Sequence, residues 1–479
     1  MESGKILAIF AAAFLLLAGA ASAQDACIDC HKIATPSLVK DFKSGAMGKE
    51  EVQNPSASKM AGNAAEIPCT SCHGSLHTTS TDFARAKMPT PETCETCHAP
   101  KVVEFKAGKH NFAWAAMHAM PTTKDQPKEI IQGQKGCGGC HKMGTKTETG
   151  LEKYRYGVAS CDSCHTRHSF STAEARRPEA CLPCHMGFDH PQWEMYSTSK
   201  HGVIYSVEGS KWDWSKRLSE ADYSAPTCQL CHMQNGDHNV ITSWGFLAVR
   251  LPEKDEKWLA NRLEILKALG VLDAKGNPTP RLDVVKAAKV ARLTEEEWQA
   301  LRDKKLKVCY KCHSQTFAKQ NLENADAVIK EADVIMADAI KTVKALYADG
   351  ILPKPSHYAE LPSYPYPDLL RFYEVQSPIE QDLYLMFMEY RMRAFQGAFH
   401  ANPDYMHWYG WAPMKETLVR MKDEAKKLRE EAVVKAELEK AKATPAPTPA
   451  PAKGICGPTA IAAIAALPLA LYALYRRRK

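Results

Sequence analysis

The feature that most constrains this chain is a pair of cysteines separated by two residues and followed directly by a histidine. It occurs eight times and uses sixteen of the 17 cysteines, leaving only Cys456. The motif cysteines are Cys27, Cys30, Cys69, Cys72, Cys94, Cys97, Cys137, Cys140, Cys161, Cys164, Cys181, Cys184, Cys228, Cys231, Cys309 and Cys312. The motif histidines are His31, His73, His98, His141, His165, His185, His232 and His313.

CxxCH is the attachment pattern of c-type haem, in which two thioethers anchor the porphyrin and the histidine is the proximal iron ligand. Structural zinc sites need four ligands each and do not require a histidine after every second cysteine. A disulfide framework has variable spacings and needs no histidine. We therefore expect eight covalent haems, numbered here with their motifs from the first to the eighth.

The N-terminus predicts export. Residues 1–23 contain Lys5, then an apolar run, then Ala21-Ser22-Ala23, the arrangement of a secretory signal peptide with its cleavage site. Because c-type haem is attached outside the cytoplasm, the two signals agree. We expect a protein secreted across the cytoplasmic membrane.

The C-terminus predicts an anchor. A Pro/Ala/Thr linker at 444–454 leads to 455–479, an apolar run followed by RRRK. The run is long enough to span a bilayer, with the basic tail inside, although a buried core helix is the alternative. The stretch KGICGPTAI also resembles the CGP-type C-terminal sorting signals of archaeal surface proteins, which implies processing or lipid attachment at Cys456.

The formal charge of +7 comes largely from Lys453 and the basic tail, so the remaining chain is close to neutral. This balance gives no basis for nucleic-acid binding. We expect a mainly α fold in which residues 24–313 wrap short helices and loops around the haems. A charged, haem-free helical insert is expected at about 252–307, and a helical region at 314–443 with helices over 321–348, 378–399 and 412–443. The proline-rich, aromatic segment 351–368 is expected to lie over another element as a loop.

Ten histidines lie outside the motifs, and electron-transfer haems commonly take a second histidine as distal ligand. A satisfied core histidine is the alternative for each of them. The distal candidates are His77, His110, His118, His168, His190, His201 and His357. We expect His77 to reach a neighbouring haem, while His357, His400 and His407 stay open for the last position.

The runs CDSCHTRHSFSTAEARRPEACLPCHMGFDHPQWEMYSTSKHG (161–202) and CQLCHMQNGDHN (228–239) resemble octahaem hydroxylamine oxidoreductase. The resemblance covers roughly residues 27–415. It implies seven bis-His haems and a catalytic fourth haem (Cys137, Cys140, His141) with an open distal face. It also implies that Asp237 and His238 form the acid–base pair over that face, and that the chain forms a homotrimer.

In oxidising members of that family, a tyrosine of the neighbouring subunit is covalently linked to the catalytic haem. Tyr405 is our candidate, with Tyr409 and Tyr358 behind it. The expected activity is oxidation of hydroxylamine to nitric oxide or nitrite, with a cytochrome or a quinone-linked protein as redox partner. Two alternatives stay open: reduction of nitrite or hydroxylamine, and a surface electron conduit without a substrate.

Overall fold

A computed structural model describes residues 23–48, 67–114, 126–131, 136–144, 160–242, 254–282, 294–355, 358, 363–371 and 377–443. The expected signal peptide up to residue 22, the linker and the C-terminal anchor with Cys456 lie outside these residues. So do two distal candidates, His118 and His357. In the described part of the chain, no helix has the length and apolar character needed to cross a bilayer.

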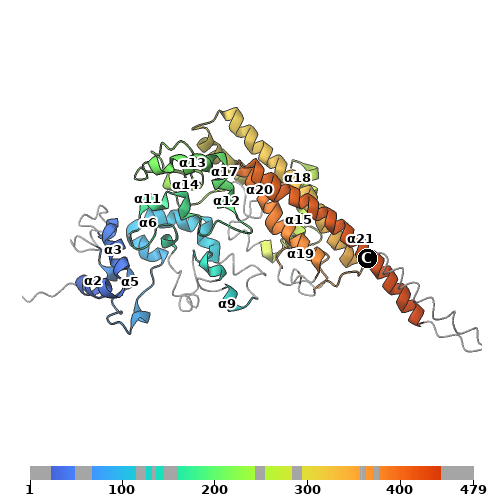
Figure 1. The fold of residues 1–479 in the computed structure, drawn as a ribbon, viewed down its shortest axis with the longest axis horizontal. Coiled ribbons are helices and arrows are strands. Elements are labelled where there is room, and N and C mark those ends of the chain that lie inside the picture. The colour runs from blue at the N-terminus through green and yellow to red at the C-terminus, as the bar shows by residue number, and fades with distance from the viewer. Residues whose placement is uncertain are drawn as a thin grey trace, which may run out of the picture. The chain divides into compact units, whose positions relative to one another are not determined.

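The motif-bearing region is built from short helical pieces. They are α2 (Ala23–Ala34), α3 (Pro36–Ser44), η1 (Ala46–Gly48), α5 (Cys69–His73), η2 (Phe83–Arg85), α6 (Pro91–Ala107), η3 (Lys109–Phe112), α9 (Lys128–Ile131), η4 (Cys137–Gly139), η5 (Cys161–Ser163), α11 (Thr172–Ala175), η6 (Pro178–Ala180), α12 (Gln192–Ser197), α13 (Lys200–Glu208), η7 (Gly209–Lys211), α14 (Cys228–His232) and η8 (Gln234–Gly236). Figure 1 shows loops joining them. The described residues contain no β-strand beyond one isolated bridge, Leu272 to Pro278.

The expected insert is helical where it is described. Helix α15 (Glu256–Ala268) begins at Asp255, whose side chain accepts a hydrogen bond from the Trp258 backbone. Helix α17 (Glu295–Cys309) begins at Thr294 in the same way and has three glutamates in its first turn, where the helix dipole favours negative charge. Helix α17 runs into the eighth motif, so the insert and that motif share one rigid element.

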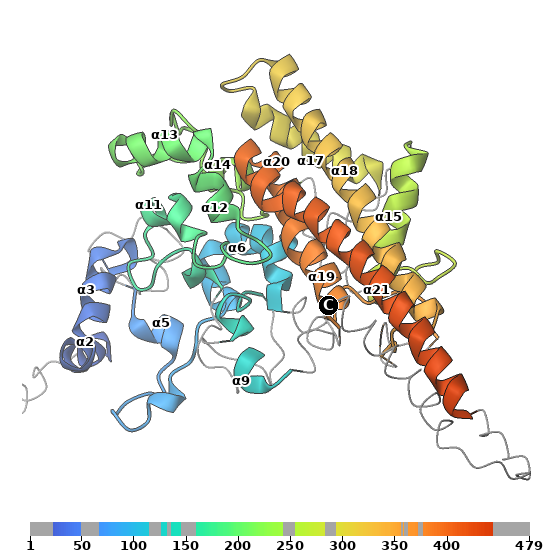
Figure 2. The ribbon, with the colours of Figure 1, turned by 45° about the vertical axis from the view of Figure 1, so that its right-hand side comes forward.

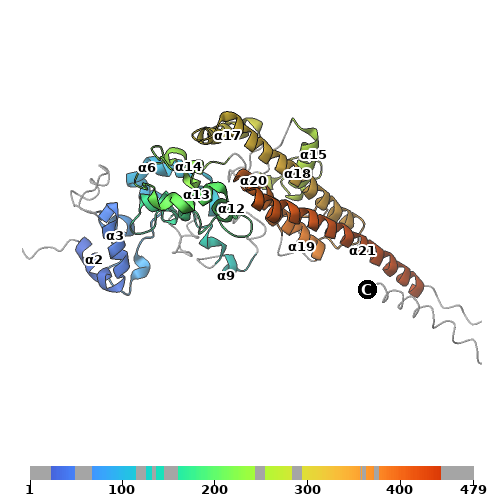
Figure 3. The same cartoon turned by 45° about the horizontal axis from the view of Figure 1, so that its top comes forward.

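Long helices follow the eighth motif, as expected. They are α18 (Gln315–Ala348), α19 (Pro378–Leu385), the π-helix η10 (Met386–Arg391), α20 (Met392–Phe399), the π-helix η11 (Tyr405–Trp411) and α21 (Ala412–Ala443). The three predicted helical ranges are confirmed, with α19, η10 and α20 forming one continuous helix. Figure 2 shows α18 and α20 side by side, and Figure 3 shows the same arrangement from above.

Helices α15, α17, α18 and α20 meet in an apolar cluster. Trp258, Trp298, Ile329, Met392 and Phe395 are its buried members. Burying large apolar side chains is the main favourable term in folding, at about 25 cal/mol per Å² of apolar surface. The cluster joins the haem-free insert to the C-terminal helices.

One carboxylate is completely buried beside this cluster. Asp333, on α18, is 0% exposed and pairs with Arg262 at 2.7 Å and with Arg391 at 2.9 Å. Its Oδ2 also accepts a 2.7 Å hydrogen bond from the Trp258 indole. The three helices α15, α18 and η10 are therefore joined through a single buried charge.

The described part of the proline-rich segment packs on α15, as expected. Tyr364 is 4% exposed and donates hydrogen bonds to the backbone carbonyls of Lys267 and Leu272. The chain divides into two compact units, residues 1–426 and 427–479. The described part of the second unit, 427–443, is the end of α21. The predicted mainly α class is confirmed.

Candidate functional site

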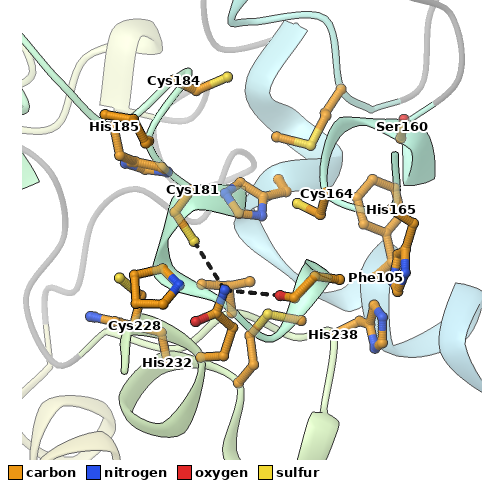
Figure 4. A pocket seen from close by; sticks show the side chains of 18 of the residues that line it. Phe105, Ser160, Cys164, His165, Cys181, Cys184, His185, Cys228, His232 and His238 are labelled. Carbon is orange, nitrogen blue, oxygen red and sulfur yellow. Dashed lines mark hydrogen bonds between the residues drawn. The ribbon is translucent and has the colours of Figure 1, made fainter. Parts of the chain in front are cut away.

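One large cavity of about 2960 Å³ collects the motifs within the first unit. All eight motif histidines line it, together with every motif cysteine except Cys30. Figure 4 shows part of it, with His165 beside His238 at one edge and His185 and His232 on other sides. Motifs spread along most of the chain thus open into a single space.

Each motif folds locally into one helical turn. The backbone N–H of the histidine donates to the carbonyl of the first cysteine in the fourth motif (2.9 Å), the fifth (3.0 Å) and the eighth (2.9 Å). Residues at i, i+3 and i+4 of such a turn lie on the same side. The two thiols and the imidazole of a motif therefore lie on one side of its turn, which is what covalent attachment of one haem requires.

Seven of the eight motif histidines face a second imidazole across the cavity. The facing pairs and the distances between their ring centres are His31–His77 (6.1 Å), His73–His168 (6.1 Å), His141–His190 (6.5 Å), His165–His238 (6.2 Å), His185–His110 (6.0 Å), His232–His400 (6.3 Å) and His313–His201 (6.1 Å). For His98, no facing ring is found among the described residues.

These separations fit haem iron. A metal–imidazole nitrogen bond is roughly 2 Å long and the ring centre lies roughly 1 Å behind the nitrogen, so two rings on opposite faces of one iron have centres roughly 6 Å apart. The paired cysteines beside each facing pair supply the thioethers. The residues present therefore fit c-type haem in type and geometry.

Five of the seven distal candidates lie opposite motif histidines: His77, His110, His168, His190 and His201. As expected, His77 faces a neighbouring motif, the first, rather than its own. Of the three histidines left open, His400 faces His232, while His407 packs against Trp408 and Trp411. Their roles as iron ligands remain predictions.

The fourth motif has an Asp-His pair opposite it, and that pair is Asp189 and His190. The Asp189 carboxylate is in very close contact with Nδ1 of His190. The ring of His190 faces His141 at 6.5 Å and lies nearly perpendicular (87°) to His185 at 6.0 Å, although His185 already faces His110. Burial by itself lowers the pKa of His190, but the hydrogen bond and charge of Asp189 outweigh it and the pKa is raised.

The expected placement of Asp237 and His238 over the fourth motif is corrected. Asn235 and Gly236 both adopt positive φ angles (58° and 79°), and the turn they form directs His238 to His165 of the fifth motif. Nδ1 of His238 lies 3.0 Å from the Gly236 carbonyl, and the carboxylate near it belongs to Glu104. Asp237 instead accepts a 2.8 Å hydrogen bond from the Asn239 backbone.

Sequence reasoning missed Asp189 because the two Asp-His pairs look alike. Each follows a CxxCH motif by four or five residues, at 189–190 and 237–238. His190 was a distal candidate, but its aspartate was not singled out. The signal that separates the pairs is spatial, since it depends on which motif the loop after the sixth motif approaches.

The C-terminal helices support this loop. Gln192 donates to Gln396 on α20 at 2.8 Å, and its own oxygen lies 3.3 Å from Nδ1 of His185. Asn402 donates to the Met195 carbonyl at 2.9 Å. Helix α12, which follows His190, is therefore fixed on one side by residues 396–402.

Tyr405, the cross-link candidate, is 9% exposed and stacks on Tyr409 at 4.9 Å. Its backbone N–H donates to Asn402 at 3.0 Å. Tyr358 is 1% exposed, whereas Tyr409 is 51% exposed. A side chain that reaches a neighbouring subunit has to be exposed on the isolated chain, and of these three only Tyr409 is.

Two relatives resemble most of the chain. A probable nitrite reductase-hydroxylamine oxidoreductase fusion protein of Kuenenia stuttgartiensis is 29% identical over 85% of this chain and 52% of its own length, so the chain spans about half of that relative. A reducing HAO-like protein complex of the same organism is 28% identical, with a TM-score of 0.64 and 87% of each chain covered. A hypothetical multihaem protein at 20% identity has a TM-score of 0.61 and shares the fold.

The family model described as "Seven times multi-haem cytochrome CxxCH" matches residues 65–267 and 281–357, which together hold the second to eighth motifs. The match covers more than half of the chain. Taken with the facing imidazoles and the cysteine-lined cavity, it shows that this chain belongs to the CxxCH multi-haem cytochrome family, whose members carry several c-type haems.

Proposed function

We propose that this protein carries eight c-type haems and acts as an oxidoreductase on small inorganic nitrogen compounds, hydroxylamine or nitrite, at the fourth motif. The observation that carries the proposal is the Asp189–His190 pair facing His141. The Kuenenia relatives named for nitrite reductase, hydroxylamine oxidoreductase and HAO-like function support the substrate class.

The chemistry needs both electrons and protons. Haem iron supplies a coordination position and one-electron steps. The Asp189 carboxylate contacts Nδ1 of His190, and the ring lines the cavity opposite His141. An imidazole with its pKa near neutrality can give or take a proton there, while the carboxylate fixes the ring and stabilises its charged form.

The other facing pairs suit electron transfer. Their ring centres are 6.0–6.3 Å apart, the separation expected for two imidazoles on one iron. In this proposal the irons of these six facing pairs, and the iron of the third motif, have two histidine ligands each. His190 carries protons and is not an iron ligand. The remaining haems then conduct electrons to or from the fourth.

Oxidation of hydroxylamine to nitric oxide or nitrite requires, by family resemblance, a tyrosine cross-link from a neighbouring subunit. Within the proposal that residue is Tyr409, because Tyr405 is buried in its own chain. Reduction of nitrite or hydroxylamine is the second candidate. The relative described as reducing supports it.

The decisive experiment is spectroscopy of the purified full chain with all haems loaded. High-spin ferric EPR from one iron, together with turnover of hydroxylamine or nitrite, supports catalysis at the fourth motif. An atypical haem absorption band and covalent trimers on a denaturing gel, both lost in Tyr409→Phe, support the oxidising form. EPR showing only low-spin iron, with no turnover, would establish the electron conduit instead.

We further propose a homotrimer on the extracytoplasmic face, held by the segment 455–479 and exchanging electrons with a cytochrome or a quinone-linked protein. Two exposed aromatic residues on η11, Trp408 (62%) and Tyr409 (51%), support a subunit contact there. The test is the molar mass in solution. A monomer at micromolar concentration contradicts the trimer.

A further inference from the structure

Lys305 places a positive charge against the seventh haem site. It lies on α17, four residues before Cys309 of the eighth motif, so both side chains lie on one helix face. Its Nζ donates to the backbone carbonyl of Cys231 and lies 3.0 Å from Nδ1 of His232. A second neighbour, the Ile241 carbonyl, lies 3.0 Å from the same Nδ1.

This cation has no carboxylate partner among the described residues. Its side chain lines the motif cavity between two motifs, because Nζ reaches the Cys231 carbonyl while the same helix carries Cys309. Lys305 therefore lies between the seventh and eighth haem sites rather than on a solvated surface.

The other motif histidines with an Nδ1 partner among the described residues have a neutral one. They are His31 with the Thr35 hydroxyl, His73 with the Lys87 carbonyl and His185 with the Gln192 amide oxygen. Within this part of the chain, His232 is the motif histidine that has a cation at Nδ1. The difference is specific to the seventh site.

The physical effect has a definite sign. A hydrogen-bond acceptor at Nδ1 makes an iron-bound imidazole more basic and favours the ferric state. A cation at the same atom opposes that effect and favours the ferrous state, which carries one positive charge less. Hydrogen bonding and local charge near the ligand are recognised determinants of haem potential.

We propose that Lys305 is a positioning residue that raises the reduction potential of the haem at the seventh motif, so that electrons collect there before moving on. One electron arrives from an adjacent haem, converts ferric to ferrous iron and leaves to the next haem, with no bond formed and no proton transferred. The inference rests on the haems of the proposed function but not on its substrate, and it holds equally for an enzyme or a conduit.

The test is a potentiometric titration of the full chain, followed by absorbance and low-spin EPR, for the wild type and three variants. Lys305→Gln removes the charge but keeps a donor for the Cys231 carbonyl, and Lys305→Arg keeps the charge. Lys304→Gln removes the neighbouring exposed lysine as the control. Haem content is measured for each variant. Lys305→Met serves as a second neutral variant, so that the test still holds if either neutral variant fails to incorporate its haems.

We expect Lys305→Gln or Lys305→Met to lower the midpoint potential of one component of the titration. The expected shift corresponds to at least a tenfold change in the oxidised-to-reduced ratio of that haem, which is about 59 mV for one electron. Lys305→Arg and Lys304→Gln should titrate like the wild type. The shifted component is assigned with His400→Met, because a Met/His ligand pair raises the potential of that same haem.

An unchanged titration of a fully loaded neutral variant overturns the proposal, and so does an equal shift in Lys304→Gln. The spin state of the fourth iron and turnover are measured separately. Failure of this inference is therefore distinguishable from failure of the proposed function.

Discussion

His238 faces His165 with nearly parallel ring planes, 13° apart, and ring centres 6.2 Å apart, although the two residues belong to the loops of different motifs. The loop after the seventh motif thereby completes the site of the fifth. The backbone N–H of His238 is fixed by Glu104 at 3.0 Å, which ties this loop to α6. The contact determines how substitutions in the loop should behave.

We expect His238→Ala to convert one low-spin iron to high-spin or to a new ligand state, because the fifth site loses its facing imidazole. All haems should stay attached, since the thioethers do not depend on the distal side. EPR and haem quantification check this result. A wild-type low-spin spectrum would show that His238 is not a ligand.

Asp189→Asn should lower turnover of the nitrogen substrate by roughly 100-fold or more, the scale of losing a positioned acid–base group. The amide can no longer stabilise a charged His190. The matched control is Asp237→Asn, which removes a carboxylate from the equivalent sequence position but should keep turnover within about twofold. Steady-state rates at equal haem content provide the measurement, and a similar loss in both variants would contradict the assignment of the pair.

Asp82→Asn should raise the potential of the first haem. Asp82 Oδ1 lies 2.9 Å from Nδ1 of His77, which faces His31, and backbone hydrogen bonds from Thr79 and Thr78 hold the pKa of this carboxyl well below its usual range. A carboxylate at Nδ1 strengthens the imidazole as a ligand to ferric iron, so the amide should favour the ferrous form. The shift is opposite in sign to that of Lys305→Gln, and one potentiometric series measures both.

Asp333→Ala should destabilise the C-terminal helices by about 3–5 kcal/mol, because Arg262 and Arg391 would keep buried charges without their counterion. The control on the same helix is Asp338→Ala, whose partner Lys422 is 55% exposed, and we expect a change below about 1 kcal/mol. Denaturant unfolding followed by tryptophan fluorescence compares the two. Equal losses of unfolding free energy in the two variants would show that the ion pairs of Asp333 contribute no more to stability than a surface ion pair.

Helix periodicity and the haem motifs predict most of the fold. The ranges 321–348, 378–399 and 412–443 are helical because their apolar residues recur at helical spacing and few glycines or prolines interrupt them. The proximal half of each site was equally predictable, since CxxCH places its ligand within one turn.

The distal half was less predictable because a facing imidazole comes from a distant loop. His168 follows the fifth motif but faces the second, and His201 faces a motif more than a hundred residues later. Nothing in the local sequence distinguishes Asp189-His190 from Asp237-His238. Only the path of the loops, with Asn235 and Gly236 at positive φ, separates them.

The His232–His400 contact also has a consequence for biosynthesis. The ribosome makes the chain from its N-terminus, so the seventh motif emerges long before the residue that faces it. Within the proposed function, a chain that is being exported can receive the haem of its seventh motif before His400 has crossed the membrane. Premature termination anywhere before His400 would therefore leave a product whose seventh site lacks its facing imidazole.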